Sequence, residues 1–140
     1  MKKSCMWVQP LGRIFLSAIF IVSGLGKAFA FGGTVAFMDS VGVPFAGAAL
    51  VLALILEIGG GLALLLGWRV RHAAYALIGF SVLATLFFHL DFSLQANQVA
   101  FFKNIGLAGG LMYVIMFGAG KWSIDNKNNN SSESLQSPAA

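Results

Sequence analysis

Hydrophobic residues in this chain are grouped in four long runs, near residues 11–31, 46–67, 72–90 and 99–119. Each run holds about 20 mostly apolar residues, the length that an α-helix needs to cross the hydrocarbon core of a bilayer. Polar residues, glycines and a proline fall between the runs and mark their ends. The pattern therefore predicts an all-α fold, a transmembrane four-helix bundle.

The segments outside the runs differ in character. Residues 32–44 read GGTVAFMDSVGVP and form the longest break between two runs. Within them, Thr34 can cap a short helix that lies in the membrane interface with its apolar side toward lipid. Residues 1–10 are a short N-terminal segment. Residues 123–140 are polar and low in complexity, which predicts a disordered tail.

Composition agrees with a membrane protein and excludes several classes of function. The chain is 58% hydrophobic and 10% charged, whereas a soluble domain carries roughly 25% charged residues. The net charge of +4 forms no basic stripe, so nucleic-acid binding is not indicated. The single cysteine, Cys5, excludes an internal disulfide. His72 and His89 lie about 25 Å apart along a helix and cannot ligate one haem, and no metal-site spacing is present.

The distribution of positive charge predicts the orientation of the chain in the membrane. With four spans, both termini share one side with the second turn. That side carries Lys2, Lys3, Arg13, Arg69, Arg71, Lys121 and Lys127. The opposite, outer side carries only Lys27 and Lys103. Because cytoplasmic loops are enriched in Lys and Arg, both termini are predicted to lie in the cytoplasm. Trp7, Trp68 and Trp122 fall at the same interface, where indoles anchor.

A cleaved signal peptide is an alternative interpretation of the first run. Lys2 and Lys3 precede an apolar stretch, and Ala28-Phe29-Ala30 resembles a small-residue cleavage site. Against this, Arg13 and Lys27 bracket the apolar part closely, and the run is long enough to span a bilayer. An uncleaved first span is therefore favoured.

Each predicted span has one face of polar or small residues, taking about 100° of rotation per residue. These residues are Arg13, Ser17, Gly24 and Lys27 in the first run; Ala53, Glu57, Gly60, Gly61 and Leu64 in the second; Ser81, Thr85 and His89 in the third; and Lys103, Gly106 and Gly110, flanked by Asn104, in the fourth. Ionisable residues within spans usually face the bundle interior. Among the glycines, Gly60, Gly61, Gly106 and Gly110 are expected to let helices pack closely.

Glu57 is the most deeply placed charge, about 16 Å from the outer end of its span. Lys103 lies about 6 Å deep and Lys27 at a similar depth, so Glu57 is predicted to pair with Lys103, with Lys27 or with both. Together with His89 and Asn104, these residues form a candidate polar cluster in the outer half of the bundle. Two interpretations stay open: a pocket for a small ligand or proton, and an internal ion pair that fixes helix register.

Several motifs together resemble the DoxX family of small four-span bacterial and archaeal membrane proteins. The motifs are Arg13 and Lys27 on either side of a Ser-Gly pair, the Gly-Val-Pro of the outer loop, Glu57 in mid-span, Gly67 before a basic turn, and FFKNIGLAGGLM at residues 101–112. The resemblance covers about residues 11–122, and the KN-x-x-L-x-G-G opening of the fourth span is its most specific part. It implies fold and location more strongly than function.

The resemblance implies a noncatalytic subunit or small-ligand-binding protein that serves a quinone-linked redox or oxidative-stress system. Its partner would be a membrane or peripheral oxidoreductase, and a bound quinone is the cofactor that the resemblance suggests. A homo-oligomer stays open. The alternative is a small proton-coupled transporter in which Glu57 titrates, although its cationic neighbours would compete with a cationic substrate. A purely structural assembly factor is a third hypothesis.

Overall fold

The computed structural model describes residues 7–128, and this part of the chain is helical throughout apart from its turns. Its helices are α1 (Val8–Phe29), α2 (Phe31–Ser40), α3 (Ala46–Leu54), the π-helical turn η2 (Ile55–Gly59), α4 (Gly60–Leu66), α5 (Val70–Phe88) and α6 (Gln95–Phe117). Four rods are long and apolar enough to cross a membrane: α1, α5, α6, and the continuous rod Ala46–Leu66 formed by α3, η2 and α4. The predicted four-helix bundle is confirmed, with the bounds of the spans shifted by a few residues.

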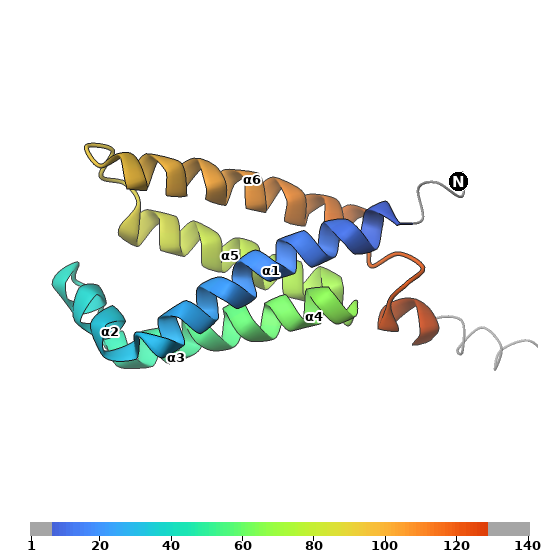
Figure 1. The fold of residues 1–140 in the computed structure, drawn as a ribbon, viewed down its shortest axis with the longest axis horizontal. Helices are drawn as coiled ribbons and strands as arrows, with labels where there is room; N and C mark the ends of the chain where they lie inside the picture. Colours follow the sequence, from blue (N-terminus) through green and yellow to red (C-terminus); the bar gives the residue numbers. More distant parts are fainter. Residues whose placement is uncertain (1–6, 129–140) are drawn as a thin grey trace, which may run out of the picture.

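The four rods run alternately in opposite directions, so the connections fall at two ends of the bundle. Helix α2 lies at one end, which we call the α2 end, whereas the first and last described residues lie at the other, the terminal end (Figure 1). The rods lie close together at the terminal end, and the pair α5 and α6 separates from α2 and α3 toward the α2 end (Figure 1). This divergence positions the candidate site described below.

The main buried core lies toward the terminal end and is made of aliphatic side chains together with one phenylalanine. It comprises Phe20, Leu64, Val70, Ala73, Ala74, Leu77, Leu107, Leu111, Val114 and Ala119. Most other large apolar side chains face outward, among them Phe15, Phe29 and Met116. Such a surface suits lipid, where burying apolar groups between helices gains little and all backbone groups are satisfied within the helices.

The loop helix α2 begins earlier than the sequence suggested, and the predicted cap is wrong. Thr34 lies inside the helix, and its hydroxyl donates to the carbonyl of Ala30 at 2.9 Å rather than capping a terminus. On one side of α2, Met38 is buried against Ala46 and Leu50 of α3. Asp39, the next residue along α2, is exposed.

The segment that follows α6 folds back onto the terminal end, so a disordered tail from residue 123 is wrong for residues 123–128. Residues 124–128 are helical, and Ser123 is buried. The carboxylate of Asp125 accepts the backbone N–H groups of Arg69 at 2.7 Å and Val70 at 3.1 Å, which caps the start of α5. Residues 129–140, like Lys2, Lys3 and Cys5, lie outside the described residues.

Arg13 explains why the chain turns tightly at this end. It is 4% exposed and donates to the carbonyl of Trp122 at 2.6 Å, and the rings of Trp7 and Trp122 lie 4.8 Å apart. Gly67 ends α4 with φ at +74°, and a Cβ there would overlap the guanidinium of Arg13 and lie 2.8 Å from the Cα of Ser123. Arg13 therefore acts at the terminal end, away from Glu57.

Helix α6 packs on a different face from the one predicted. Its buried residues are Leu107, Leu111 and Val114, whereas Lys103 and Gly106 are exposed. A Cβ on Gly106 would meet nothing within 4 Å, so its predicted packing role does not hold within this chain. Gly110 does lie against another helix, because a Cβ there would be 3.1 Å from Leu16. At about 100° per residue, the centre of the packed face lies roughly 70° from the centre of the predicted face.

Candidate functional site

A cavity of about 630 Å³ occupies the half of the bundle nearer the α2 end. We call it the pocket. All four rods and α2 contribute to its walls, which are mainly apolar. Its size lies within the usual range of about 300–1,000 Å³ for small-molecule sites. The ionisable residues in its lining are Lys27, Glu57, Tyr75, His89 and Lys103.

The pocket exists because two neighbouring rods pack on different partners. Helix α3 packs against α1 and α2, while α5 packs against α4, η2 and α6. The rods α5 and Ala46–Leu66 are therefore in contact through α4 and η2, whereas α3 separates from α5 toward the α2 end (Figure 1). Leu52 and Ala53 on one rod, and Leu83 and Ala84 on the other, line the space between them.

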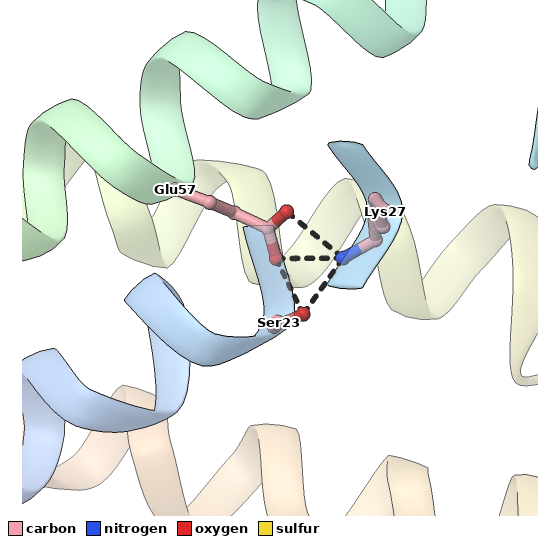
Figure 2. A network of polar contacts seen from close by, with 3 residues as sticks. All are labelled: Ser23, Lys27 and Glu57. Atoms are coloured by element: carbon pink, nitrogen blue, oxygen red, sulfur yellow. Dashed lines mark hydrogen bonds and ion pairs between the residues drawn. The ribbon is translucent and has the colours of Figure 1, made fainter. Parts of the chain in front are cut away.

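Glu57 forms an ion pair with Lys27 at the wall of the pocket (Figure 2). The Nζ of Lys27 lies 2.8 Å from each carboxylate oxygen. The hydroxyl of Ser23 donates to Oε1 of Glu57 at 2.9 Å and accepts from Lys27 at 2.7 Å. The Glu57 side chain is 3% exposed and that of Lys27 is 33% exposed. Both oxygens of a deeply buried carboxylate are thus engaged by donors from α1, as a buried charge requires.

Local sequence brings these three side chains together. Ser23 and Lys27 are four residues apart on α1 and share one face. Between them, Gly24 lets α1 approach η2 closely: a Cβ there would lie 2.7 Å from Ile58 and 3.2 Å from the Cβ of Glu57. Sequence reasoning did not assign Ser23 to the cluster, although its i, i+4 spacing from Lys27 was a usable signal.

The π-helical turn η2 is a second feature that the sequence did not reveal. It spans Ile55–Gly59 with Glu57 at its centre, inside an otherwise α-helical rod. A π-turn inserts an extra residue and changes the direction of the side chains that follow, and such turns are frequent at functional sites. Beyond it, Gly60 packs on Leu77 of α5 and Gly61 on Ile21 of α1, where an added Cβ would come within 2.9 Å and 2.7 Å of those side chains. Both glycines therefore lie where neighbouring helices approach closely.

Lys103 lines the pocket but does not pair with Glu57, so this alternative is corrected. It is exposed, and it forms no hydrogen bond or ion pair with residues 7–128. The depths of Glu57 and Lys103 along the membrane normal suggested this pairing, but depth alone does not give the lateral distance between two helices. Lys103 lies on nearly the same side of α6 as Gly110, but closer to the α2 end, where α6 and α1 separate (Figure 1). Lys27 of α1 already contacts both carboxylate oxygens.

Asn104 and His89 belong to a separate polar group between α5 and α6. The amide of Asn104 donates to the hydroxyl of Thr85 at 2.8 Å, and Thr85 donates in turn to the carbonyl of Ser81 at 2.8 Å. The Nδ1 of His89 lies 3.4 Å from the Oδ1 of Asn97 in the first turn of α6. All the candidate residues thus line one pocket, but only Lys27 and Glu57 bond to each other. Asn104 and His89 make separate contacts between α5 and α6.

Of the other titratable residues near the α2 end, Asp39 lies on α2 and Asp91 in the turn between α5 and α6. In the turn between α5 and α6, the hydroxyl and the backbone N–H of Ser93 both donate to Asp91, and these bonds hold the pKa of that carboxyl below its usual value. His72 is exposed near the start of α5, at the opposite end from His89. Within residues 7–128, no three His, Cys, Asp or Glu side chains are grouped as metal ligands.

Comparison with known proteins shows clear relatives. The model of the DoxX family matches residues 9–90. The inner membrane protein YqjF of Escherichia coli (strain K12) is 38% identical over 115 residues, covering 82% of this chain and 87% of that protein. The inner membrane protein YphA of the same organism is 28% identical over 122 residues, covering 84% of this chain and 87% of that protein. No solved structure matches the chain significantly.

Proposed function

This chain belongs to the DoxX family of integral membrane proteins, and on that premise we propose that it is a noncatalytic protein that binds a small apolar molecule within the bilayer. The observation that carries the proposal is the pocket of about 630 Å³, with apolar walls and the group formed by Glu57, Lys27 and Ser23 at one side. A few convergent polar groups in a mainly apolar cavity are typical of small-molecule sites.

The proposed ligand has an apolar body and a head that can form hydrogen bonds. Lys27 is one-third exposed and can direct a donor into the pocket while it holds Glu57. Asn104 and His89 offer polar atoms on the opposite wall. A quinone has this chemistry, and the resemblance to a family linked with quinone-dependent oxidoreductases supports it as the ligand and such an enzyme as the partner.

A pocket-filling variant with a matched control tests this proposal. Gly79 lines the pocket and Gly109 does not, yet both are helical glycines at which a Cβ would meet nothing within 4 Å. The assay is fluorescence titration of the purified protein in detergent with pyrenebutanol, followed by competition with decylubiquinone. Gly79→Leu should weaken binding at least ~10-fold, because it fills the space that the probe needs, whereas Gly109→Leu should bind as the native protein does. Failure of the native protein to bind the probe saturably would refute the proposal.

A proton-coupled transporter is the second candidate, and the observation in its favour is that the buried carboxylate of Glu57 lines the pocket. Lys27 opposes it, since a proton would have to replace a cation that contacts both carboxylate oxygens at 2.8 Å. The two functions separate in liposomes. Proton-driven substrate flux that is lost in Glu57→Gln, while probe binding persists, would establish transport.

We further propose that the protein lies in the inner membrane with the terminal end in the cytoplasm. The relatives are inner membrane proteins, and Arg69, Arg71 and Lys121 are exposed at the terminal end. Positive charge is retained on the cytoplasmic side. Reporter fusions after Arg71 and after Lys121 should report cytoplasm, and a fusion after Asp39 should report the outer side. A carboxyl terminus outside the cytoplasm would overturn this orientation.

A further inference from the structure

The charges that line the pocket do not cancel. Lys27 and Glu57 neutralise each other, and both oxygens of Glu57 already accept hydrogen bonds. Tyr75 and His89 add nothing to the formal net charge, which counts His as neutral. Lys103 therefore leaves the pocket with an excess of about one positive charge.

No residue in the described part of the chain compensates Lys103. The acidic residues in the segments at the α2 end are Asp39 on α2 and Asp91 in the loop before α6. Neither forms an ion pair with Lys103. Lys103 also lies eight residues after α6 begins at Gln95, about 12 Å along the helix. A cation at such a position within a span is costly, and it usually has a partner or marks a ligand pathway.

The apolar walls of the pocket around Lys103 indicate that the remainder of the ligand is apolar. Across the pocket from α6, side chains such as Ile19, Leu52 and Leu56 are apolar. A free inorganic anion would leave these walls uncovered, whereas a fully apolar molecule would leave Lys103 uncompensated. An amphiphile with one negative headgroup satisfies both, because Lys presents a compact charge with three donors.

We propose that the pocket selects an amphiphilic anion, whose headgroup pairs with the Nζ of Lys103 and whose apolar body lies between α3 and α5. This inference rests on the proposed function, the binding of a small molecule in the pocket, and it makes an anion the preferred ligand of that site in place of an uncharged quinone. The headgroup chemistry is a carboxylate or a phosphate, which a fatty acid or a lipid phosphate would supply.

A matched pair of probes tests the charge selectivity. Pyrenebutanoate and pyrenebutanol share one apolar body and differ in the charge of the head. In fluorescence titrations, the native protein should bind the anion at least ~10-fold more tightly, a difference of about 1.4 kcal/mol. Lys103→Gln should reduce this preference below ~2-fold by weakening the binding of pyrenebutanoate. Lys103→Arg should retain the preference, and so should Lys121→Gln, which removes an exposed cation at the terminal end.

The outcomes separate this inference from the proposed function. If neither probe binds saturably, the proposed function fails. If pyrenebutanol binds and pyrenebutanoate binds no better, or if the preference survives in Lys103→Gln, the pocket stands and the anion inference is overturned. Competition by dodecanoate supports a fatty-acid source, and competition by dodecyl phosphate alone supports a lipid phosphate.

Discussion

Removing either partner of the pair between Lys27 and Glu57 should destabilise the protein, but by unequal amounts. Two unit charges 2.8 Å apart attract by about 6 kcal/mol at an effective dielectric constant of about 20, and desolvation offsets much of that gain. What matters in a variant is the charge left behind. Breaking a buried pair costs about 3–5 kcal/mol when the remaining charge stays buried.

The two losses of stability differ because the side chains of Glu57 and Lys27 differ in exposure. Lys27→Met strands Glu57, which is 3% exposed, so we expect a loss of about 3 kcal/mol. Glu57→Gln strands Lys27, which is 33% exposed and can extend its ammonium toward water, so we expect only about 1 kcal/mol. The amide introduced by Glu57→Gln would also keep an oxygen that accepts from Ser23. The double variant should be more stable than the sum of the two losses implies.

The assay is unfolding of the four proteins in one neutral detergent, followed by circular dichroism against temperature and against denaturant. Lys103→Met is the matched control, because it also removes a span lysine from the pocket lining but breaks no bond within residues 7–128. It should change stability by less than about 0.5 kcal/mol. Equal losses for Lys27→Met and Glu57→Gln, or strictly additive losses in the double variant, would refute the reasoning.

Three further variants test the packing at the terminal end and on α6 by thermal unfolding. Gly67→Ala should cost at least about 2 kcal/mol, because it combines a left-handed φ of +74° with overlap on Arg13; a loss below about 0.5 kcal/mol, the effect of an ordinary surface change, would contradict this. Gly106→Ala should instead gain about 0.5–1 kcal/mol, since its Cβ meets nothing within 4 Å, and a marked loss would show that another molecule packs there. Asp125→Ala should cost about 1 kcal/mol, because it removes the cap on the first N–H groups of α5, and an unchanged melting temperature would show that the capping bonds are not maintained.

Much of the fold follows from the sequence alone. Four apolar runs of helix-spanning length, separated by glycines and polar turns, leave a membrane chain few alternatives to a helical bundle, because every backbone polar group must be satisfied within its own helix. The same logic placed Glu57 on an interior face, since a charge that deep must have a partner. It also identified the small-residue face of the second span, where Gly60 and Gly61 pack.

Only the tertiary structure decided which partner Glu57 has and where the pocket lies. Helical periodicity gives the face of each residue within its own span, but the rotation of one span against another depends on side-chain packing across the bundle. On α6, packing buries Leu107 and Leu111 and leaves Lys103 exposed, whereas Lys27 of α1 pairs with Glu57. The π-helical turn at Glu57 and the folding back of Asp125 onto α5 likewise depend on contacts between segments far apart in the sequence, so no local pattern could reveal them.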